Sequence, residues 1–454
     1  MYDINRLRLL DKAIIGVILV ATVAFGALVE IRSVYLSTRK TDVGCYFRAA
    51  WAYRTDTNIY DVPDDNGWHY AYPPAFAILM APFADAPKGF EQLPIAFPYK
   101  VSVAIWYFIS VICLAWGIHI LAKAVEDTSA EGSFLSSYPP GSRPWWWLRL
   151  VPFGICLPAI GSTFSRGQVN TIVLLSIAGF AAETIRNRRG CAGLWLSVGI
   201  CLKVIPAFLL ILPLVRRDLR TLGYSALGMF IGLAVIPTVG MGPERAWESS
   251  RYFLVHTIAP GLGEAGTGTM AKELTGMNVT DNQSFQAIIH NLKYWSNLPR
   301  PRQADESTKL LHVSLAGLMT LVSFLAVRRW ADRRFSDMFL IGNLTMIMFM
   351  ASPVCHHHYF ALAVPLVLTL VAVEMQNRSD LKFGISMSIL VLIQMAMEIL
   401  PKIPALEKLR DAGVTLESGV ILWGWGVATC WQLKSATVTI GQQPIVEERL
   451  RTAA

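Results

Sequence analysis

The chain has 454 residues, of which 54% are hydrophobic and 16% are charged, and its formal net charge is +8. A soluble protein of this size carries about 25% charged residues, whereas here apolar runs of about 17–25 residues recur along the whole length. The composition excludes a soluble enzyme and predicts an all-α polytopic membrane protein, with residues 1–454 forming a single integral-membrane domain. The basic residues lie in short clusters between the apolar runs, which predicts contact with the lipid bilayer and no binding of nucleic acid. Seven cysteines, mainly inside apolar runs, show no disulfide or zinc spacing.

The first apolar run, residues 13–31, is long enough to span a bilayer. Arg6 and Arg8 precede it, which predicts a cytoplasmic N-terminus. Residues 32–97 then form a first outer loop. Within it, residues 75–82 are apolar but too short to span, so we expect a juxtamembrane helix that begins after a double proline.

The apolar stretch 191–215 has arginine clusters on both sides, ending at Arg188 and beginning at Arg216. A single span would place one of these clusters outside, against the usual cytoplasmic bias of basic residues. Lys203 and Pro206 lie near the middle, where proline disfavours a continuous helix. The pattern therefore predicts a hairpin of two half-helices with both ends on the cytoplasmic side, tolerated only where broken helices line a cavity or are buried.

The remaining apolar runs predict a second outer loop at 241–307 and a cytoplasmic tail at 434–454. No internal repeat is visible, which disfavours a duplicated transporter fold. The prediction is about ten full spans plus the hairpin. The expected spans are 13–31, 99–122, 148–164, 168–184, 221–240, 309–327, 337–353, 359–375, 383–400 and 417–433.

Asp42 is an acid at the exit of the first predicted span. A partly desolvated carboxylate at an apolar boundary is a suitable general base for an acceptor hydroxyl. Two alternatives are equally open from composition alone: a solvated loop acid, or a helix N-cap for residues 43–54. The other acids of this loop lie among turn-forming residues, and we expect most of them to be solvated. They are Asp56, Asp61, Asp64 and Asp65.

The first outer loop contains Asp42 with Tyr46, then Asn58-Ile59-Tyr60, then Tyr70-Ala71-Tyr72-Pro73-Pro74 and Pro82. This pattern resembles the first outer loop of the GT-C glycosyltransferases of family 87, which are similar to polyprenyl-phosphate-mannose-dependent alpha-1,2-mannosyltransferases. Weaker matches follow in the same order as in the family, so that the resemblance covers roughly residues 13–375. They are Gly167-Gln168-Val169-Asn170, Gly193 through Lys203 and Pro206 to Arg216-Arg217, Asp281-Asn282-Gln283-Ser284, and Ser352-Pro353 followed by histidines.

The last of these matches departs from the family pattern. The family element has a tryptophan before two adjacent histidines, whereas Cys355 here precedes three, His356, His357 and His358. His358 is the first choice for the family's histidine, and its two neighbours remain open. A metal site is an alternative, but adjacent residues on a helix point in different directions, so they rarely bind one ion.

The resemblance implies a GT-C fold and a metal-independent, inverting hexose transfer without a cofactor. The donor would be a polyprenyl-phosphate sugar, by family default mannose, and the acceptor an envelope glycolipid or glycan on the outer face of the inner (plasma) membrane. Asp42 would be the base and His358 a second catalytic group, while Asn282 and Gln283 would bind the acceptor. The groups expected to bind the donor phosphate and sugar are Lys203, Arg166, His356, His357, Gln168, Asn170, Tyr46 and Tyr72.

Several of these residues have simpler interpretations. Lys203 lies in an apolar stretch and either faces a cavity or extends to the interface. Arg166 is equally an interfacial anchor, and Gln168 and Asn170 equally cap or pack helices. The alternative function is a transporter or flippase of lipid-linked sugars, which the two long outer loops and the absence of visible repeats disfavour. An envelope polymerase or ligase would share the outer loops, but no motif of such a family is visible.

Overall fold

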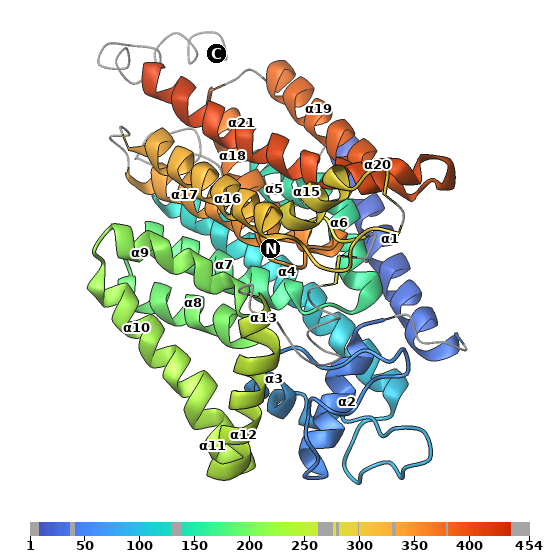
Figure 1. Ribbon diagram of the computed structural model, residues 1–454. Coiled ribbons are helices and arrows are strands. Elements are labelled where there is room, and N and C mark those ends of the chain that lie inside the picture. The colour runs from blue at the N-terminus through green and yellow to red at the C-terminus, as the bar shows by residue number, and fades with distance from the viewer. Residues whose placement is uncertain are drawn as a thin grey trace.

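The computed structural model describes residues 9–36, 41–128, 139–261, 276–277, 281–297, 299–328, 333–377 and 380–436. Within these ranges every regular element is a helix (Figure 1). Arg6 and Arg8, part of the predicted second outer loop and most of the predicted C-terminal tail lie outside the described residues. The all-helical prediction is therefore confirmed for the described part of the chain.

Six helical stretches in the described residues are long and apolar enough to cross a membrane, or seven if one bent pair counts as a span. Shorter apolar helices occupy Asn170–Ile185, Arg189–Leu202, Ile205–Val215 and Ser336–Met350. The protein is thus a multi-pass membrane protein, and the total of about ten spans stays a prediction. The six stretches are Asp11–Tyr35, Tyr99–Asp127, Leu219–Met241, Glu306–Val327, His357–Gln376 and Phe383–Lys402.

The third predicted span, 148–164, is not one straight helix. It is divided into α5 (Arg143–Ile155) and α6 (Leu157–Arg166), which are bent by 67°. Pro158 stands in the first turn of α6. Since proline has no N–H to continue the helix ladder, the chain changes direction at this point.

The stretch 191–215 breaks where the sequence predicts. Helix α8 (Arg189–Leu202) ends at an extended Lys203, and the chain continues through η4 (Ile205–Leu210) into α9 (Ile211–Val215). Both ends lie together, because Arg189 Nη1 is 3.8 Å from Asp218 Oδ1. The segment therefore leaves and returns on one side of the helical body.

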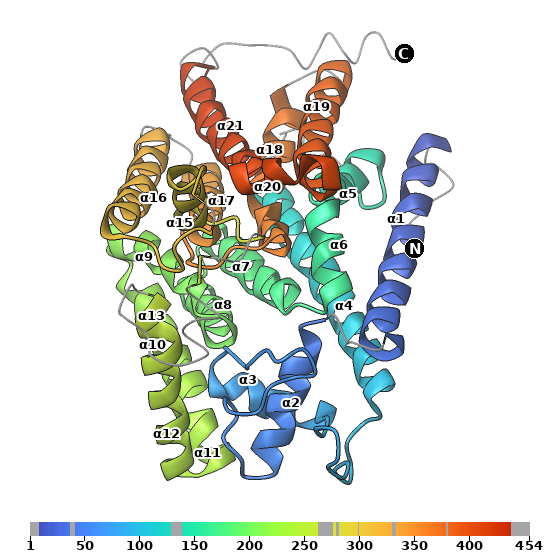
Figure 2. The same ribbon diagram turned by 45° about the vertical axis from the view of Figure 1, so that its right-hand side comes forward.

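The helices pack around α7 (Asn170–Ile185), which lies between α4 (Tyr99–Thr128) and α8. Figure 2 shows α1 (Leu9–Glu30) at one edge of the molecule and α10 (Leu219–Phe230) at the opposite edge. The two short helices of the predicted first outer loop lie between these edges at one end. These are α2 (Val43–Arg54) and α3 (Pro74–Leu79).

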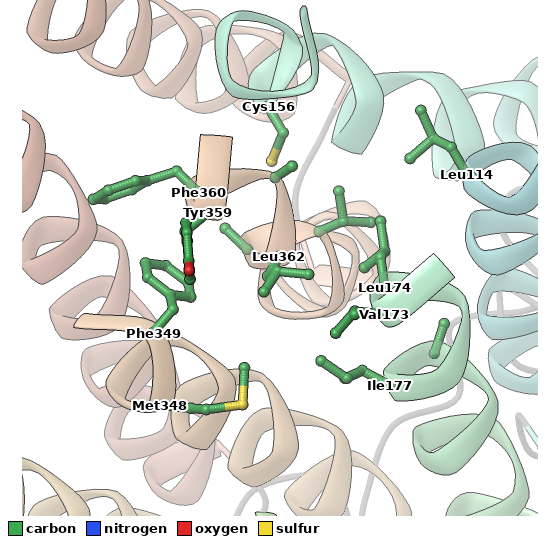
Figure 3. Close-up of a cluster of buried hydrophobic side chains, with 14 of the residues drawn as sticks. Leu114, Cys156, Val173, Leu174, Ile177, Met348, Phe349, Tyr359, Phe360 and Leu362 are labelled. Atoms are coloured by element: carbon green, nitrogen blue, oxygen red, sulfur yellow. The ribbon is translucent and has the colours of Figure 1, made fainter. Parts of the chain in front are cut away.

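The apolar core encloses the segment that follows the three histidines. Figure 3 shows Tyr359 and Leu362 pointing into a cluster with Phe349 and Leu174. They belong to η7 (His357–Ala363), which packs against α6 and leads into a buried helix. Because η7 is locked in the core, the histidines at its start are held in place relative to α6.

Both predicted outer loops contain helices. Helix α3 and the short η3 (Ala81–Phe83) confirm the predicted helix at 75–82, with Pro74 in the first turn of α3. The predicted second loop contains α12 (Pro243–Phe253), η6 (Leu254–Ile258), α13 (Ala259–Gly261) and α15 (Phe285–Lys293).

The remaining helices complete the described part of the chain. They are η2 (Ile31–Tyr35), η5 (Ile231–Val235), α11 (Ile236–Met241), α16 (Glu306–Val327), α17 (Arg333–Met350), α18 (Val364–Asn377), α19 (Asp380–Ile399), η8 (Leu400–Lys402), η9 (Pro404–Leu406), α20 (Glu407–Ala412) and α21 (Val414–Ala436).

Candidate active site

Asp42 is the residue that directly precedes α2, and it is half-buried. Its backbone N–H donates to the Arg166 carbonyl at 2.9 Å, and its Oδ2 accepts a hydrogen bond from Gln168 Nε2. Although Asp42 occupies the N-cap position of α2, its side chain makes no capping hydrogen bond there. The Asp42 carboxylate is therefore oriented by Gln168, which follows α6, and it does not cap α2.

The turn that contacts Asp42 depends on a glycine. Helix α6 ends at Arg166, and Gly167 follows with a φ of +67°, the left-handed conformation that favours glycine at helix ends. Trp106 Nε1 donates to the Gly167 carbonyl at 2.7 Å. Gly167 also packs closely on α2, because a Cβ placed there would lie 2.9 Å from Val43 Cβ. This turn fixes the start of α2 beside the end of α6.

Two phenols complete the surroundings of Gln168. Tyr46 donates to Gln168 Oε1 at 3.3 Å, and its hydroxyl lies 3.1 Å from that of Tyr72. Burial raises the pKa of Tyr46 well above its usual value, with Tyr72 and Asp42 adding to the effect. Burial likewise raises the pKa of Tyr72. Both groups therefore stay neutral donors near the carboxylate.

Lys203 is buried, with 8% of its surface exposed, so it does not extend to an interface. Its Nζ donates to Asn170 Oδ1 at 2.9 Å and lies 3.8 Å from the centre of the Tyr359 ring. Asn170 Nδ2 in turn donates to the His358 carbonyl at 3.0 Å. An amine at this depth is stabilised by an amide and by an aromatic face.

The three histidines point to different partners. His356 Nδ1 lies 3.5 Å from Asp281 Oδ2, which also lies 3.7 Å from Arg166 Nη2. His357 Nε2 lies 2.6 Å from Glu398 Oε2. His358 is 2% exposed, and its Nδ1 has no hydrogen-bond partner among the described residues. Within the same part of the chain, no three His, Cys, Asp or Glu side chains are grouped as metal ligands.

Asn282 and Gln283 hold loops together. Asn282 Nδ2 donates to the Pro353 carbonyl at 2.9 Å, and its Oδ1 accepts from the Cys355 N–H at 3.0 Å. Gln283 Nε2 donates to the Arg410 carbonyl at 2.9 Å. Both side chains are buried, so their predicted contact with an acceptor stays a prediction.

The expectation that most other acids of the first loop are solvated is wrong for two of them. Asp64 is buried and accepts from the N–H groups of Asn66 and Trp68 at 2.8 and 2.9 Å. Asp65 pairs with the buried Arg48 at 3.1 Å. These acids stabilise the loop, because local backbone bonds and a buried cation satisfy their charge.

Sequence reasoning missed Glu398, which is 3% exposed and faces His357. The sequence does point to Glu398, because an acid within the apolar run 383–400 is energetically costly unless it is paired. It also missed Thr163, whose hydroxyl donates to the His358 carbonyl at 2.9 Å. A threonine in an apolar helix carries no comparable signal.

Together these features define a multi-pass membrane protein with a polar site between α2, α6, α8 and η7. The chain belongs to Glycosyltransferase family 87, whose sequence pattern matches residues 70–353. Asp42 and the three histidines lie outside the matched residues.

Two curated relatives carry the same name, polyprenol-phosphate-mannose-dependent alpha-(1-2)-phosphatidylinositol mannoside mannosyltransferase. The one from Mycobacterium tuberculosis is 28% identical over 268 residues, covering 55% of this chain and 57% of the relative. The one from Mycolicibacterium smegmatis is 29% identical over 203 residues, covering 44% and 41%. The match thus spans about half the length of these relatives.

The overall arrangement is similar to that of ArnT from Cupriavidus metallidurans, solved in complex with undecaprenyl phosphate and in the apo state. The complex shares 12% identity and a TM-score of 0.46, covering 93% of this chain and 78% of ArnT. The apo structure shares 14% identity and a TM-score of 0.44, with the same coverage.

Proposed function

We propose that this protein is an inverting GT-C glycosyltransferase that moves mannose from polyprenyl-phosphate mannose to an envelope glycolipid or glycan. The observation that carries the proposal is the half-exposed Asp42 carboxylate, oriented by Gln168 in a chain of family 87. The names of the two mycobacterial relatives support this donor and a glycolipid acceptor. A flippase of lipid-linked sugars is not favoured, because both relatives are named transferases.

In the proposed reaction, Asp42 takes the proton of an acceptor hydroxyl as its oxygen bonds to the sugar C1. The bond between C1 and the bridging phosphate oxygen breaks, and its electron pair stays on the polyprenyl phosphate. That phosphate gains one negative charge, which Lys203, Arg166 and the histidines are suited to stabilise. Arg166 provides a positive charge and the other side chains provide polar contacts, so the reaction is proposed to need no metal or cofactor.

Transfer in a defined system tests the proposal. The purified protein in lipid nanodiscs is given labelled polyprenyl-phosphate mannose and a panel of glycolipid acceptors. Asp42→Asn should lower transfer about 10²- to 10⁴-fold, the usual contribution of a general base. Asp61→Asn is the matched control, because Asp61 is an exposed acid of the same loop that pairs with Asn58.

Two results would contradict the proposal. Wild-type protein that transfers no sugar to any acceptor would exclude the function, and undiminished transfer by Asp42→Asn would exclude the base. Transfer should also survive an excess of chelator. Complete loss that is restored by a divalent cation would show that the mechanism depends on a metal.

We further propose the finer topology: about ten spans, a re-entrant hairpin at 191–215, cytoplasmic termini and a site on the outer face of the inner membrane. The contact of Arg189 with Asp218 supports the hairpin. Single cysteines at Arg188 and Arg217 should react with an impermeant thiol reagent from the same side. Labelling from opposite sides would refute the hairpin.

A further inference from the structure

Glu398 is a buried carboxylate near the end of the apolar helix α19. An ionised acid at such a position is costly unless a cation or several donors meet it. Its Oε2 lies 2.6 Å from His357 Nε2. The pair therefore joins α19 to the histidine segment through the two side chains best suited to share a proton or a charge.

Further groups lie near this pair. Lys402, one turn after Glu398, interacts electrostatically with Glu398 and with Arg166 from α6. The Cys156 thiol, between α5 and α6, also lies within electrostatic range of Glu398. The Glu398 carboxylate thus lies near the cation Lys402, but the ring of His357 makes the contact at 2.6 Å.

Both neighbours of His357 belong to the candidate active site. His356 contacts Asp281, the partner of Arg166, while the His358 carbonyl is held by Thr163 and Asn170. A displacement of the His357 ring would therefore occur within a segment that is fixed on both sides.

His357 has one ring nitrogen engaged and one not. Nε2 lies 2.6 Å from Glu398 Oε2, although this contact lacks hydrogen-bond geometry, and Nδ1 has no hydrogen-bond partner among the described residues. A carboxylate beside one ring nitrogen sets the orientation of an imidazole and leaves the other ring nitrogen available to a ligand. A ring held in this way presents Nδ1 in a fixed direction to a ligand oxygen.

We propose that Glu398 is a positioning residue that orients the His357 ring for the phosphate of the lipid donor. This inference rests on the proposed function and assigns His357, in place of His358, as the imidazole that receives the leaving phosphate. Glu398 itself touches no substrate. It acts by keeping the His357 ring aimed at the phosphate as the phosphate gains its negative charge.

A double-mutant cycle of Glu398→Gln and His357→Gln tests the proposal, with kcat and donor KM measured for each variant. Loss of one donor to a developing charge costs about 10²- to 10³-fold in kcat, which we expect for His357→Gln. Loss of a group that orients an imidazole costs about 10- to 100-fold, which we expect for Glu398→Gln. The double variant should be no worse than His357→Gln alone, because Glu398 acts only through that ring.

Glu374→Gln is the matched control. Glu374 is 4% exposed and lies near the far end of α18, whereas His357 precedes the start of that helix. Its replacement removes a buried acid without touching the site, so transfer per folded protein should stay near wild type. Gel filtration and thermal melting confirm that each variant is folded. Additive losses in the cycle, or wild-type kcat in Glu398→Gln, would overturn the proposal.

A binding readout separates this inference from the proposed function. Polyprenyl phosphate without a sugar should raise the melting temperature of the wild type, and should raise it less in Glu398→Gln and His357→Gln. If that pattern holds while no acceptor is glycosylated, the anion site stands and the proposed function fails. If transfer occurs but Glu398→Gln binds and turns over normally, the inference alone fails. A wild type that neither binds nor transfers contradicts both.

Discussion

Gln168 donates a hydrogen bond through Nε2 to Oδ2 of Asp42, a residue 126 positions earlier in the chain. Its Oε1 accepts from the Tyr46 hydroxyl. An amide has one donor side and one acceptor side, so both bonds require the same orientation of the side chain. Gln168 is therefore the link between the end of α6 and the carboxylate at the start of α2.

Replacement of Gln168 by leucine should lower transfer more than it lowers stability. Without the amide, the Asp42 carboxylate rotates freely, and a misplacement of about 1 Å costs roughly 10²-fold in rate. We expect kcat to fall about 10- to 100-fold with a smaller change in donor KM. Initial-rate kinetics measure this, with Gln92→Leu, an exposed glutamine of the same loop, as control. An unchanged kcat would show that Asp42 needs no such support.

Gly167→Ala should impair transfer through its contact with α2. Left-handed backbone costs a residue with a Cβ about 1–2 kcal/mol, and the new methyl would meet Val43 at 2.9 Å. Gly67→Ala carries the same backbone strain at a φ of +79° but has open space. Only the variant at 167 should therefore lose activity beyond its loss of thermal stability. Equal losses in both variants would exclude a role for the contact.

Lys203→Met should weaken binding of the lipid donor. A hydrogen bond from a charged group contributes about 1.5–3 kcal/mol, so the donor KM should rise roughly 10- to 100-fold. Lys123→Met is the control, since Lys123 is exposed and pairs with Asp127 within its own helix. Donor titration at saturating acceptor measures the effect. If Lys203→Met has the same donor KM as the wild type, Lys203 has only a structural role.

Arg48→Met should destabilise the first loop. The Arg48 side chain is 4% exposed, and its Nη2 lies 3.1 Å from Asp65 Oδ1 and 3.5 Å from Asp85 Oδ2. Removing one member of a buried ion pair costs about 3–5 kcal/mol, because the remaining charge stays buried. Thermal melting and limited proteolysis between α2 and α4 should both report the loss. Asp61→Asn, in an exposed part of the same loop, should leave both unchanged.

Acid should loosen the packing of α15. The pKa of His290 lies below its usual 6.5, mainly because of burial, with the bond to the Pro301 carbonyl acting in the opposite direction. When α15 loosens, His290 becomes exposed and its pKa returns toward 6.5. The loosened form therefore binds a proton at His290 more readily than the packed form does. The contribution of His290 to the stability of this packing is fully present above about pH 6.5. It is lost as the pH drops toward the lowered pKa of His290.

Hydrogen exchange of residues 285–297, corrected for intrinsic rates, measures this effect between about pH 7.5 and pH 5.5. The neighbouring charged groups are Asp305, Arg300 and Lys293. His290→Gln does not titrate, so its exchange should change little over this range. If acid raises the exchange rate equally in the wild type and in His290→Gln, the effect arises from those neighbouring groups and not from His290.

Features that depend on a few consecutive residues could be predicted from the sequence. Apolar runs give helices of spanning length, Pro74 starts α3, and the chain breaks between Lys203 and Pro206. Asp42 could be singled out as a candidate because it is an acid beside an apolar run. Hydropathy and the fixed geometry of proline act locally, so these features need no knowledge of the fold.

Only the tertiary structure decided which side chains meet. Gln168 reaches Asp42, Lys203 bonds Asn170, and Glu398 faces His357 across long stretches of sequence. Asn282 and Gln283, predicted to bind the acceptor, hydrogen-bond to the backbone of neighbouring loops. Such pairings follow from how helices pack and rotate against one another, which local patterns do not encode. The sequence by itself thus determined a multi-pass helical protein with an acid beside its first apolar helix, and the packing determined the network that orients this acid.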